Sequence, residues 1–356
     1  MIHRFTASNF RCLEKVELEL SPAFNLVFGA NASGKTSLLE ALAYLGRGKS
    51  FRGASTGNLV RHGEGEFVLF GETEAGGRRR RLGVRNSKDG LEVRVDGESD
   101  GGVAALAEAL PLQVIDPEVH NLVAGGPEQR RRFLDWIAFH VEQGHLQTWR
   151  RFRRALKQRN AALKARAAAK TIRSWNAEFL ELSDQLDASR RAALGVALET
   201  LREHGERLLG TELGFEYQQG WSKDKDLGKA LEEGLDRDMH QGATQQGPHR
   251  ADLRVAYDER QARKLVSRGQ QKLLASAMIL AATETAQTAL ERPLLLLLDD
   301  PAAELDKDSL ARLLDAVLGL GCQVVATSLE KNALAVPPGT STFHVEHGVL
   351  TPESAA

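Results

Sequence analysis

This chain has few cysteines, a net charge near zero and no long apolar runs, and each of these properties argues against a class of protein. The two cysteines among its 356 residues, Cys12 and Cys322, form no C-x-x-C pair, which argues against a disulfide framework and a cysteine-based zinc site. Both lie in strand-like sequence, so we expect them to be buried thiols. No apolar stretch approaches the length of a bilayer span and the N-terminus lacks a signal-peptide core, which predicts a soluble, cytoplasmic protein with no membrane partner.

The formal net charge is only −1, which argues against a globally basic DNA binder, but the basic residues are unevenly distributed. Between Arg130 and Arg173 the acids are just Asp135 and Glu142. Such a stripe suits contacts with DNA phosphates, although a solvated helix face is the usual meaning of a charge run. The stripe consists of Arg131, Arg132, Arg150, Arg151, Arg153, Arg154, Lys157, Arg159, Lys164, Arg166 and Lys170. Its candidate DNA contacts are Arg150, Arg151, Arg153, Arg154 and Lys157, and the arginines at 78–81 are a weaker candidate.

A glycine-bounded loop stands between an apolar run at 24–28 and a helix-like stretch at 37–42, which is the pattern of a phosphate-binding loop. Its glycines let the backbone N–H groups point inward, where the positive end of the following helix adds to them. The lysine can reach the β- and γ-phosphates, and the threonine hydroxyl can ligate Mg²⁺. The alternative is a glycine turn before an ordinary helix. The candidate ATP contacts are Gly29, Ala30, Asn31, Ala32, Ser33, Gly34, Lys35, Thr36 and Ser37, and Thr36 is also a candidate Mg²⁺ ligand.

A second apolar run at 294–298 ends in two carboxylates, as a strand buried on both faces does. Beside a phosphate loop, Asp299 could hold Mg²⁺ directly or through water. Asp300 is then the candidate to orient or deprotonate the attacking water. Without the phosphate loop, the same residues would be a core strand with a polar turn.

Ser267, Gly269 and Gln270 precede a long apolar stretch at 273–280. A serine hydroxyl and bare N–H groups at a helix start suit an anion. The string resembles the signature loop of ABC-type ATPases, which contacts the γ-phosphate bound by the opposite subunit. Alone, it would be an ordinary serine cap before a buried helix.

Periodicity divides the chain into strand-rich and helical parts. The first hundred residues alternate with period two, whereas apolar and aromatic residues from 133 to about 209 recur every three to four residues. We therefore expect an α/β fold with helices inserted into it. The order of the phosphate loop, the signature-like string and the acidic strand resembles an ABC-type ATPase head with mixed sheets and a phosphate-loop core, and the long spacer between Lys35 and Ser267 indicates an inserted helical lobe. The expected head is residues 1–130 and 210–356, and the expected lobe is residues 131–209.

Several strings resemble the RecF family of bacterial recombination-repair ATPases, nearly from end to end. They are NFR at 9–11, GKSFR at 48–52, PEVHNLVAGGPEQRRRFLD at 117–135, LKQRN at 156–160 and GPHRAD at 247–252. The resemblance implies a cytoplasmic DNA-binding ATPase with weak, DNA-stimulated turnover that uses ATP and Mg²⁺. It also implies a homodimer formed with ATP on gapped, single-stranded or duplex DNA, and RecR and RecO as mediator partners in recombinase loading.

The chain departs from these patterns at several positions. Ala303 replaces a common serine, Ser309 stands where the family carries a basic residue, and Thr327 and Ser328 stand where many ABC ATPases place a histidine that touches the γ-phosphate. Gln113 is the candidate for the catalytic glutamine that links Mg²⁺ and water to the lobe. His249 and Arg250 would be surface loop residues, with a role near the nucleotide or dimer face implied only by the resemblance.

Two other functions share the head chemistry. An ATPase subunit of a membrane transporter is disfavoured by the long inserted lobe and its basic stripe. An ATPase fused to a nuclease is disfavoured because too little chain follows Asp306 to hold a nuclease domain.

Overall fold

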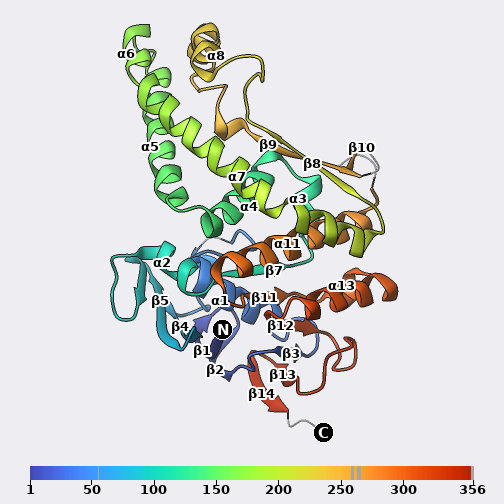
Figure 1. Ribbon diagram of the computed structural model, residues 1–356. Helices are drawn as coiled ribbons and strands as arrows, with labels where there is room; N and C mark the ends of the chain where they lie inside the picture. Colours follow the sequence, from blue (N-terminus) through green and yellow to red (C-terminus); the bar gives the residue numbers. More distant parts are fainter. Residues whose placement is uncertain (55, 258–259, 263–265, 354–356) are drawn as a thin grey trace. The chain divides into compact units, whose positions relative to one another are not determined.

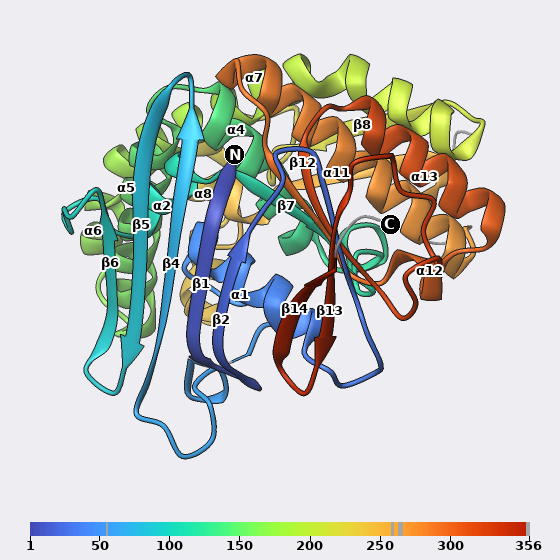
Figure 2. The ribbon, with the colours of Figure 1, turned by 90° about the horizontal axis from the view of Figure 1, so that it is seen from below.

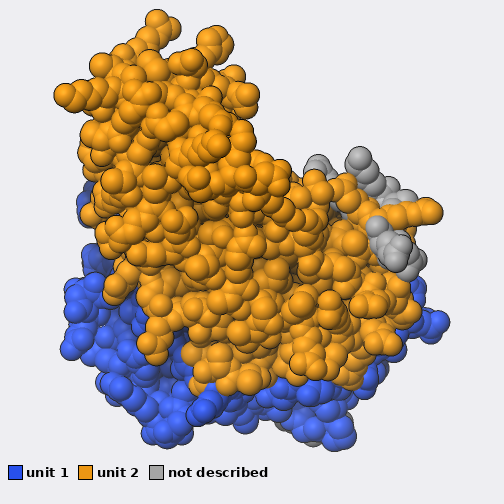
Figure 3. Space-filling model, turned by 45° about the horizontal axis from the view of Figure 1, so that its top comes forward, with its two compact units in different colours: residues 1–119, 291–356 blue, residues 120–290 orange. Residues whose placement is uncertain are grey.

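The computed structural model describes residues 1–54, 56–257, 260–262 and 266–353 (Figure 1). It divides into two compact units, one of residues 1–119 and 291–356 and the other of residues 120–290 (Figure 3). The expected lobe lies wholly within the second unit. That unit also contains residues 210–290, which the sequence pattern assigns to the head, because the long helix α11 packs on helices α7 and α4.

The first unit contains a five-stranded antiparallel sheet, whose strands lie side by side in Figure 2. In spatial order, its strands are β2 (Leu13–Glu19), β1 (Ile2–Phe10), β4 (Glu66–Ala75), β5 (Arg78–Ser87) and β6 (Gly90–Val95). The arginines of β5 face acids on neighbouring strands: Arg79 pairs with Glu74, Arg81 with Glu72 and Arg85 with Glu66. The weaker DNA candidate at 78–81 is therefore largely a set of cross-strand ion pairs.

A second, six-stranded sheet completes the first unit. In spatial order, its strands are β14 (Val349–Glu353), β13 (Ser341–Glu346), β3 (Phe24–Phe28), β12 (Gln323–Ser328), β11 (Leu295–Leu298) and β7 (Leu112–Ile115). β13, β3, β12, β11 and β7 run parallel, and β14 is antiparallel to β13. The unbroken leucines of β11 are all buried, as expected for a parallel strand covered on both faces. The helical elements of this unit are α1 (Lys35–Arg47), η1 (Thr56–Asn58), α2 (Gly102–Ala109), α12 (Pro301–Glu304) and α13 (Lys307–Gly319).

Helix α1 is buried on most of its circumference because it contacts strands of both sheets. Its residues Leu38, Leu39 and Leu42 are fully buried in a core that both sheets share. A helix that is apolar all round belongs inside a protein. The phosphate loop is thus attached to the most enclosed helix of this unit.

One carboxylate interrupts the apolar surface of α1. Glu40 is fully buried and accepts hydrogen bonds from Arg11 and from the Ser50 hydroxyl. A buried charge requires such a partner. This brace joins the NFR string, the GKSFR string and α1, which gives a structural role to two of the strings that resemble the RecF family.

The second unit is mainly helical. Its elements are α3 (Asn121–Ala124), α4 (Pro127–Val141), α5 (His145–Lys164), α6 (Ala169–Ser174), α7 (Asn176–Leu209), β8 (Leu213–Gln218), α8 (Leu227–Glu233), α9 (Leu235–Gln241), η2 (Pro248–Arg250), β9 (Asp252–Tyr257), β10 (Arg260–Gln261) and α11 (Arg268–Leu290). The three strands form one antiparallel sheet in the order β10-β9-β8. The predicted aromatic stripe is core here, since Phe152, Phe179 and Leu186 are buried together.

Helix α11 corrects the expectation that no apolar stretch approaches the length of a bilayer span. Within the described part of the chain, Arg268–Leu290 is one helix long and apolar enough to cross a membrane by length and composition alone. However, 72% of its most apolar window is buried in the protein, which is the property of a core helix. A single helix of this kind is weak support for a membrane span.

Candidate nucleotide-binding site

The carboxyl ends of four parallel strands lie at one edge of the six-stranded sheet. Strand pairing places Phe28 beside Ser328, and Leu298 beside both Ala326 and Ile115. The phosphate loop, the two acids of the 299–300 pair and the residues after β7 therefore gather at this edge. In open parallel sheets, ligands bind in this position.

The loop at 29–36 has the backbone that its glycines predict. Gly34 begins α1 at φ 118°, a value that side chains avoid. A Cβ at Gly29 would stand 2.3 Å from the carbonyl oxygen of Val345, so the loop packs against β13 at a distance that only glycine allows. The buried Ser33 hydroxyl has no hydrogen-bond partner among the described residues, which suits a loop shaped for an oxygen-rich ligand.

Lys35 lies folded over this loop. Its ammonium donates to the carbonyl oxygens of Gly29, at 2.6 Å, and Ala30, at 2.9 Å. Burial lowers the pKa of Lys35, while the nearby carboxylates of Asp300 and Asp299 act in the opposite direction. The ammonium is therefore already at the loop and has two weak carbonyl partners that phosphate oxygens can replace.

Thr36 and Asp299 meet, as the sequence predicts for a magnesium site. The Thr36 hydroxyl donates to Asp299 Oδ1 at 3.0 Å. Burial raises the pKa of the Asp299 carboxyl, and hydrogen bonds from Thr36 and Thr327 oppose that shift. A hydroxyl and a carboxylate held together at a phosphate loop fit Mg²⁺ in an ATP site.

Asp300 has a left-handed backbone, with φ 47° and ψ 54°. Its N–H donates to the Thr327 hydroxyl at 2.9 Å, and its carboxylate is close enough to Lys35 to oppose the lowering of the Lys35 pKa by burial. A non-glycine residue in this conformation costs about 1–3 kcal/mol, and such strain concentrates at functional sites. The geometry therefore brings the candidate base to the same edge as Lys35 and Asp299.

Gln113 is not brought to this edge. It lies within β7, is 4% exposed, and its Oε1 accepts a hydrogen bond from Arg47 at 3.0 Å. The residue that follows the end of β7 is Asp116, which the sequence reasoning missed although an Asp-Pro pair directly after an apolar strand marks a strand end. Burial raises the pKa of Asp116 to about 6, and the negative charge of Asp299 adds to that effect.

Thr327 and Ser328, which stand where many ABC ATPases have a histidine, both form side-chain hydrogen bonds. The Thr327 hydroxyl donates to Asp299 Oδ1 at 3.0 Å, and the Ser328 hydroxyl donates to the carbonyl oxygen of Glu330 at 2.7 Å. Ser309 is likewise occupied, because it donates to the Asp306 carboxylate at the start of α13. Arg312, one turn later, donates to the Ser309 hydroxyl at 3.2 Å, so a guanidinium is present near the position that lacks the family's basic residue.

The signature-like residues lie in the second unit, at the start of α11. The N–H of Ser267 donates to Gln270 Oε1 at 3.0 Å, and the N–H of Gln270 donates to Ser267 Oγ at 3.3 Å. This reciprocal pair is a capping box. Gly269 is exposed, and a Cβ placed on it would meet nothing within 4 Å. Gln270 thus shapes the helix start, which presents the Ser267 hydroxyl and the backbone of Gly269 to solvent.

Helix α5 carries most of the basic stripe, including the five candidate DNA contacts. All five candidate DNA contacts are exposed, and within the described residues the side chains of Arg150, Arg154 and Lys157 form no ion pair or hydrogen bond. Arg151 lies 4.0 Å from Glu178, and the Arg153 guanidinium lies 4.9 Å from the centre of the Trp149 ring. These residues form a face of α5 that has positive charge and little compensation.

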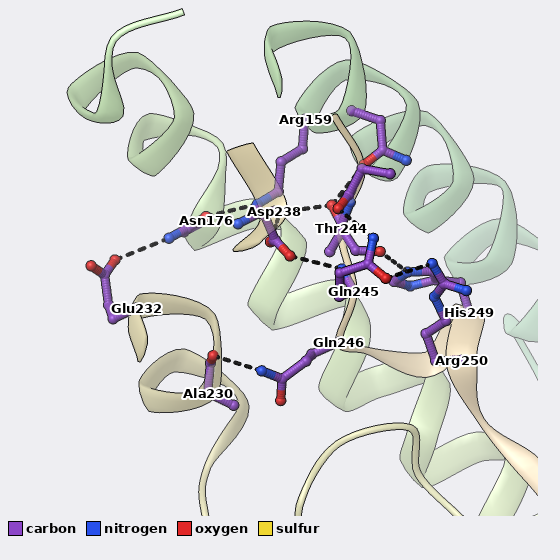
Figure 4. A network of polar contacts seen from close by, with 12 residues as sticks. Arg159, Asn176, Ala230, Glu232, Asp238, Thr244, Gln245, Gln246, His249 and Arg250 are labelled. Carbon is purple, nitrogen blue, oxygen red and sulfur yellow. Dashed lines mark hydrogen bonds and ion pairs between the residues drawn. The ribbon is translucent and has the colours of Figure 1, made fainter. Parts of the chain in front are cut away.

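Arg159 does not belong to that face. It is fully buried, and it donates to Asp238 at 2.8 Å and to the Thr244 hydroxyl at 2.7 Å (Figure 4). His249 lies in the same network, with Nε2 2.8 Å from the carbonyl oxygen of Thr244, and burial lowers its pKa to about 4. The LKQRN and GPHRAD strings thus meet in a buried polar network of the second unit, and Arg250 is its exposed end.

The cysteines differ from each other. Cys322 is buried, and burial raises the pKa of its thiol to about 12, as expected for an inert core cysteine. Cys12 is exposed in the turn between β1 and β2, with Sγ 3.4 Å from the Ser37 hydroxyl, so the expectation that it is buried was wrong. Adjacent strands of a hairpin leave their turn in solvent, which the period-two pattern alone does not reveal.

Asp116 generates a testable pH dependence. Its pKa is about 6 in the folded chain against an ordinary value of 3.8, so the folded state keeps its proton longer and the free energy of unfolding falls as pH rises from about 4 to about 6. Asp116→Asn removes this effect. Thermal unfolding from pH 4 to pH 7 should show the stability of the variant rising relative to the wild type up to about pH 6 and no further, by a few kcal/mol at about 1.4 kcal/mol per pKa unit. The exposed acid variant Asp100→Asn is the control, and a pH-independent difference for Asp116→Asn would contradict the assignment.

Residues 1–348 match the family described as RecF/RecN/SMC N terminal domain. The chain is 39% identical over 352 residues to the DNA replication and repair protein RecF of Edwardsiella ictaluri, covering 98% of each chain. Its fold is similar to that of the recombination mediator protein RecF solved with ATP, with a TM-score of 0.90 at 23% identity over 99% of this chain and 97% of that one. An Smc head solved with the C-winged helix domain of ScpA is a more distant neighbour, with a TM-score of 0.62 at 14% identity over 100% of this chain and 97% of that one. These comparisons confirm the expected α/β ATPase-head fold and the resemblance drawn from the sequence, and the chain belongs to the RecF family.

Proposed function

We propose that this protein is an ATP-dependent DNA-binding protein of recombinational repair and replication maintenance, and that it works as a slow, DNA-stimulated ATPase in the cytoplasm. The observation that carries the proposal is the meeting of Lys35, Thr36 and Asp299 at one sheet edge, in a chain of the RecF family. The solved relative described as RecF with ATP supports ATP as the nucleotide.

The residues of the first unit suit ATP binding and hydrolysis. Backbone N–H groups of the loop and the Lys35 ammonium hold the β- and γ-phosphates, and Thr36 with Asp299 would hold Mg²⁺, which neutralises phosphate charge when bound. Asp300 orients a water molecule and takes its proton as the water oxygen bonds to the γ-phosphorus. The bond from that phosphorus to the bridging oxygen breaks, and ADP and phosphate leave.

ATP binding would bring two copies together. Ser267 and Gly269 have an exposed hydroxyl and N–H at a helix start, which suits a γ-phosphate held by a second copy. Dimers would then form with ATP and separate after hydrolysis. RecR and RecO are the mediator partners we propose, since a solved relative is described as part of the RecFOR pathway.

The exposed face of α5 suits DNA. Arg150, Arg154 and Lys157 have no acidic partner in the described chain, so a phosphate backbone would supply the compensating charge. Contacts of this kind do not depend on sequence, which fits gapped DNA with single-stranded and duplex parts. A transporter ATPase has no use for such a face, and the family comparison does not favour that alternative.

Asp300→Asn tests the hydrolytic step. The amide cannot accept the proton, so single-turnover ATP cleavage should fall by about 10²–10⁴ while ATP affinity is retained. Asp308→Asn, an exposed acid on α13, should cleave ATP at the wild-type rate. Lys35→Ala should instead lose ATP binding, measured by equilibrium titration. A rate for Asp300→Asn within about threefold of wild type, well below that range, rules out Asp300 as the base.

Ser267→Arg tests dimer formation. The wild type should sediment as a monomer without nucleotide and as a dimer with ATP and Mg²⁺. Ser267→Arg should bind ATP and stay monomeric, because the substitution removes the hydroxyl and places a larger side chain at the exposed helix start. Ser174→Arg, which places the same side chain on α6, should dimerise normally, and a normal dimer for Ser267→Arg would refute the role of the signature loop.

A salt titration tests the DNA face. The triple variant of Arg150, Arg154 and Lys157 to Gln should weaken DNA binding and flatten the plot of log affinity against log salt by about 0.9 for each phosphate that the protein no longer neutralises. The matched control replaces Arg79, Arg81 and Arg85 with Gln, which removes the same charge from residues already paired with acids. A slope for the Arg150, Arg154 and Lys157 variant equal to that of the wild type would show that DNA binds elsewhere.

A further inference from the structure

We propose that Thr327 is a positioning residue for ATP hydrolysis. Its single hydroxyl orients Asp299 by a hydrogen bond to the Asp299 carboxylate, and it positions Asp300 by a hydrogen bond from the Asp300 backbone N–H. The inference rests on the proposed ATPase function and goes beyond it. Many ABC ATPases have a histidine that contacts the γ-phosphate at this position, whereas Thr327 would act on Asp299 and Asp300.

Thr327 is placed between the two halves of the site. It lies in β12, whose neighbours are β3, which leads into the phosphate loop, and β11, which leads into the acids. The side chain is fully buried. Its hydroxyl therefore has no access to bulk solvent and must find its hydrogen bonds within the protein.

The hydroxyl makes two different bonds at once. Its proton goes to Asp299 Oδ1 at 3.0 Å, and its oxygen accepts the N–H of Asp300 at 2.9 Å. One hydroxyl has one proton and two lone pairs, so these bonds do not compete. The carbonyl oxygen of Leu298, at 3.4 Å, is a longer alternative for the proton.

The two bonds fix different quantities. Asp299 Oδ1 also accepts the Thr36 hydroxyl at 3.0 Å, so two threonines from different elements set the direction of this carboxylate. Asp300 has a left-handed backbone and precedes Pro301, and both features disfavour its conformation. The hydrogen bond from its N–H to Thr327 stabilises that conformation, and so fixes the backbone from which the side chain of the candidate base extends.

A simpler role for Thr327 is to satisfy buried polar groups and nothing more. That role predicts a loss of stability on substitution with no specific change in chemistry. The positioning role predicts a fall in the cleavage rate and in metal affinity at nearly unchanged nucleotide affinity, because the loop and Lys35 hold the phosphates independently of Thr327.

The experiment compares Thr327→Val, which keeps the shape and removes the hydroxyl, with Thr327→Ser, which keeps the hydroxyl. Thr73→Val is the matched control, since Thr73 is a buried strand threonine of the same unit outside the site. Three quantities are measured on the full chain: single-turnover ATP cleavage, affinity for a non-hydrolysable ATP analogue, and Mn²⁺ affinity of the analogue complex by electron paramagnetic resonance.

For Thr327→Val we expect cleavage about tenfold to a hundredfold slower and Mn²⁺ affinity about tenfold weaker, as when a partner that orients a metal ligand is removed. Analogue affinity should stay near that of the wild type. Thr327→Ser should restore both quantities, and Thr73→Val should change neither. Wild-type cleavage and Mn²⁺ affinity in Thr327→Val would overturn the proposal.

A substitute variant covers the case of misfolding, and separate outcomes distinguish a failure of the proposed function from a failure of the positioning role. If Thr327→Val does not fold, as judged by circular dichroism, Thr327→Cys carries the test, because a thiol is a weak donor of similar size and the same two decreases are expected. Wild-type protein that binds the analogue without cleaving ATP would contradict the proposed function, whereas an Asp300→Asn variant that cleaves normally would rule out only Asp300 as the base. A Mn²⁺ affinity insensitive to Thr327→Val would sink the positioning role alone.

Discussion

The alignment of parallel strand ends at one sheet edge is the constraint on which the candidate site depends. β3, β12, β11 and β7 are far apart in sequence, yet their pairing brings the phosphate loop, Thr327, Asp299 and Asp116 to the same edge. Backbone hydrogen bonds between the strands fix this alignment, independently of the side chains of the site. The enclosure of α1 by both sheets then holds the loop in place from the other end.

Buried charges secure the segments around this framework. Glu40 joins α1 to Arg11 and Ser50 in the first unit, and Asp238 joins α9 to Arg159 in the second. A buried ion pair contributes little net stability, but removing one partner is costly because the other charge stays buried. Such pairs therefore specify which segments lie together. This explains why strings that resemble the RecF family occur at positions remote from the phosphates.

The parts of the site that follow from local sequence could be predicted, and those that depend on strand phase or pairing could not. Residues 29–36 need only neighbours along the chain, and so does the apolar strand before Asp299. The sequence does not reveal that Gln113 lies within β7, where its side chain accepts a hydrogen bond from Arg47. Arg159 follows the same basic pattern as Arg154, and only helix packing shows that one is buried and the other exposed.

The charges at the sheet edge limit how the site can work. The carboxylates of Asp299 and Asp300 lie near the Lys35 ammonium. The charge of Asp299 adds to the effect of burial on the pKa of Asp116, and the charge of Asp300 adds to the effect of burial on the pKa of Asp299. A triphosphate would bring more negative charge to this edge, so binding needs added positive charge. The hydroxyls of Thr36 and Thr327 can donate hydrogen bonds but cannot supply that charge. Under the proposed function, this edge would bind the nucleotide together with a metal ion, and the hydroxyls of Thr36 and Thr327 would orient the carboxylate that holds the ion.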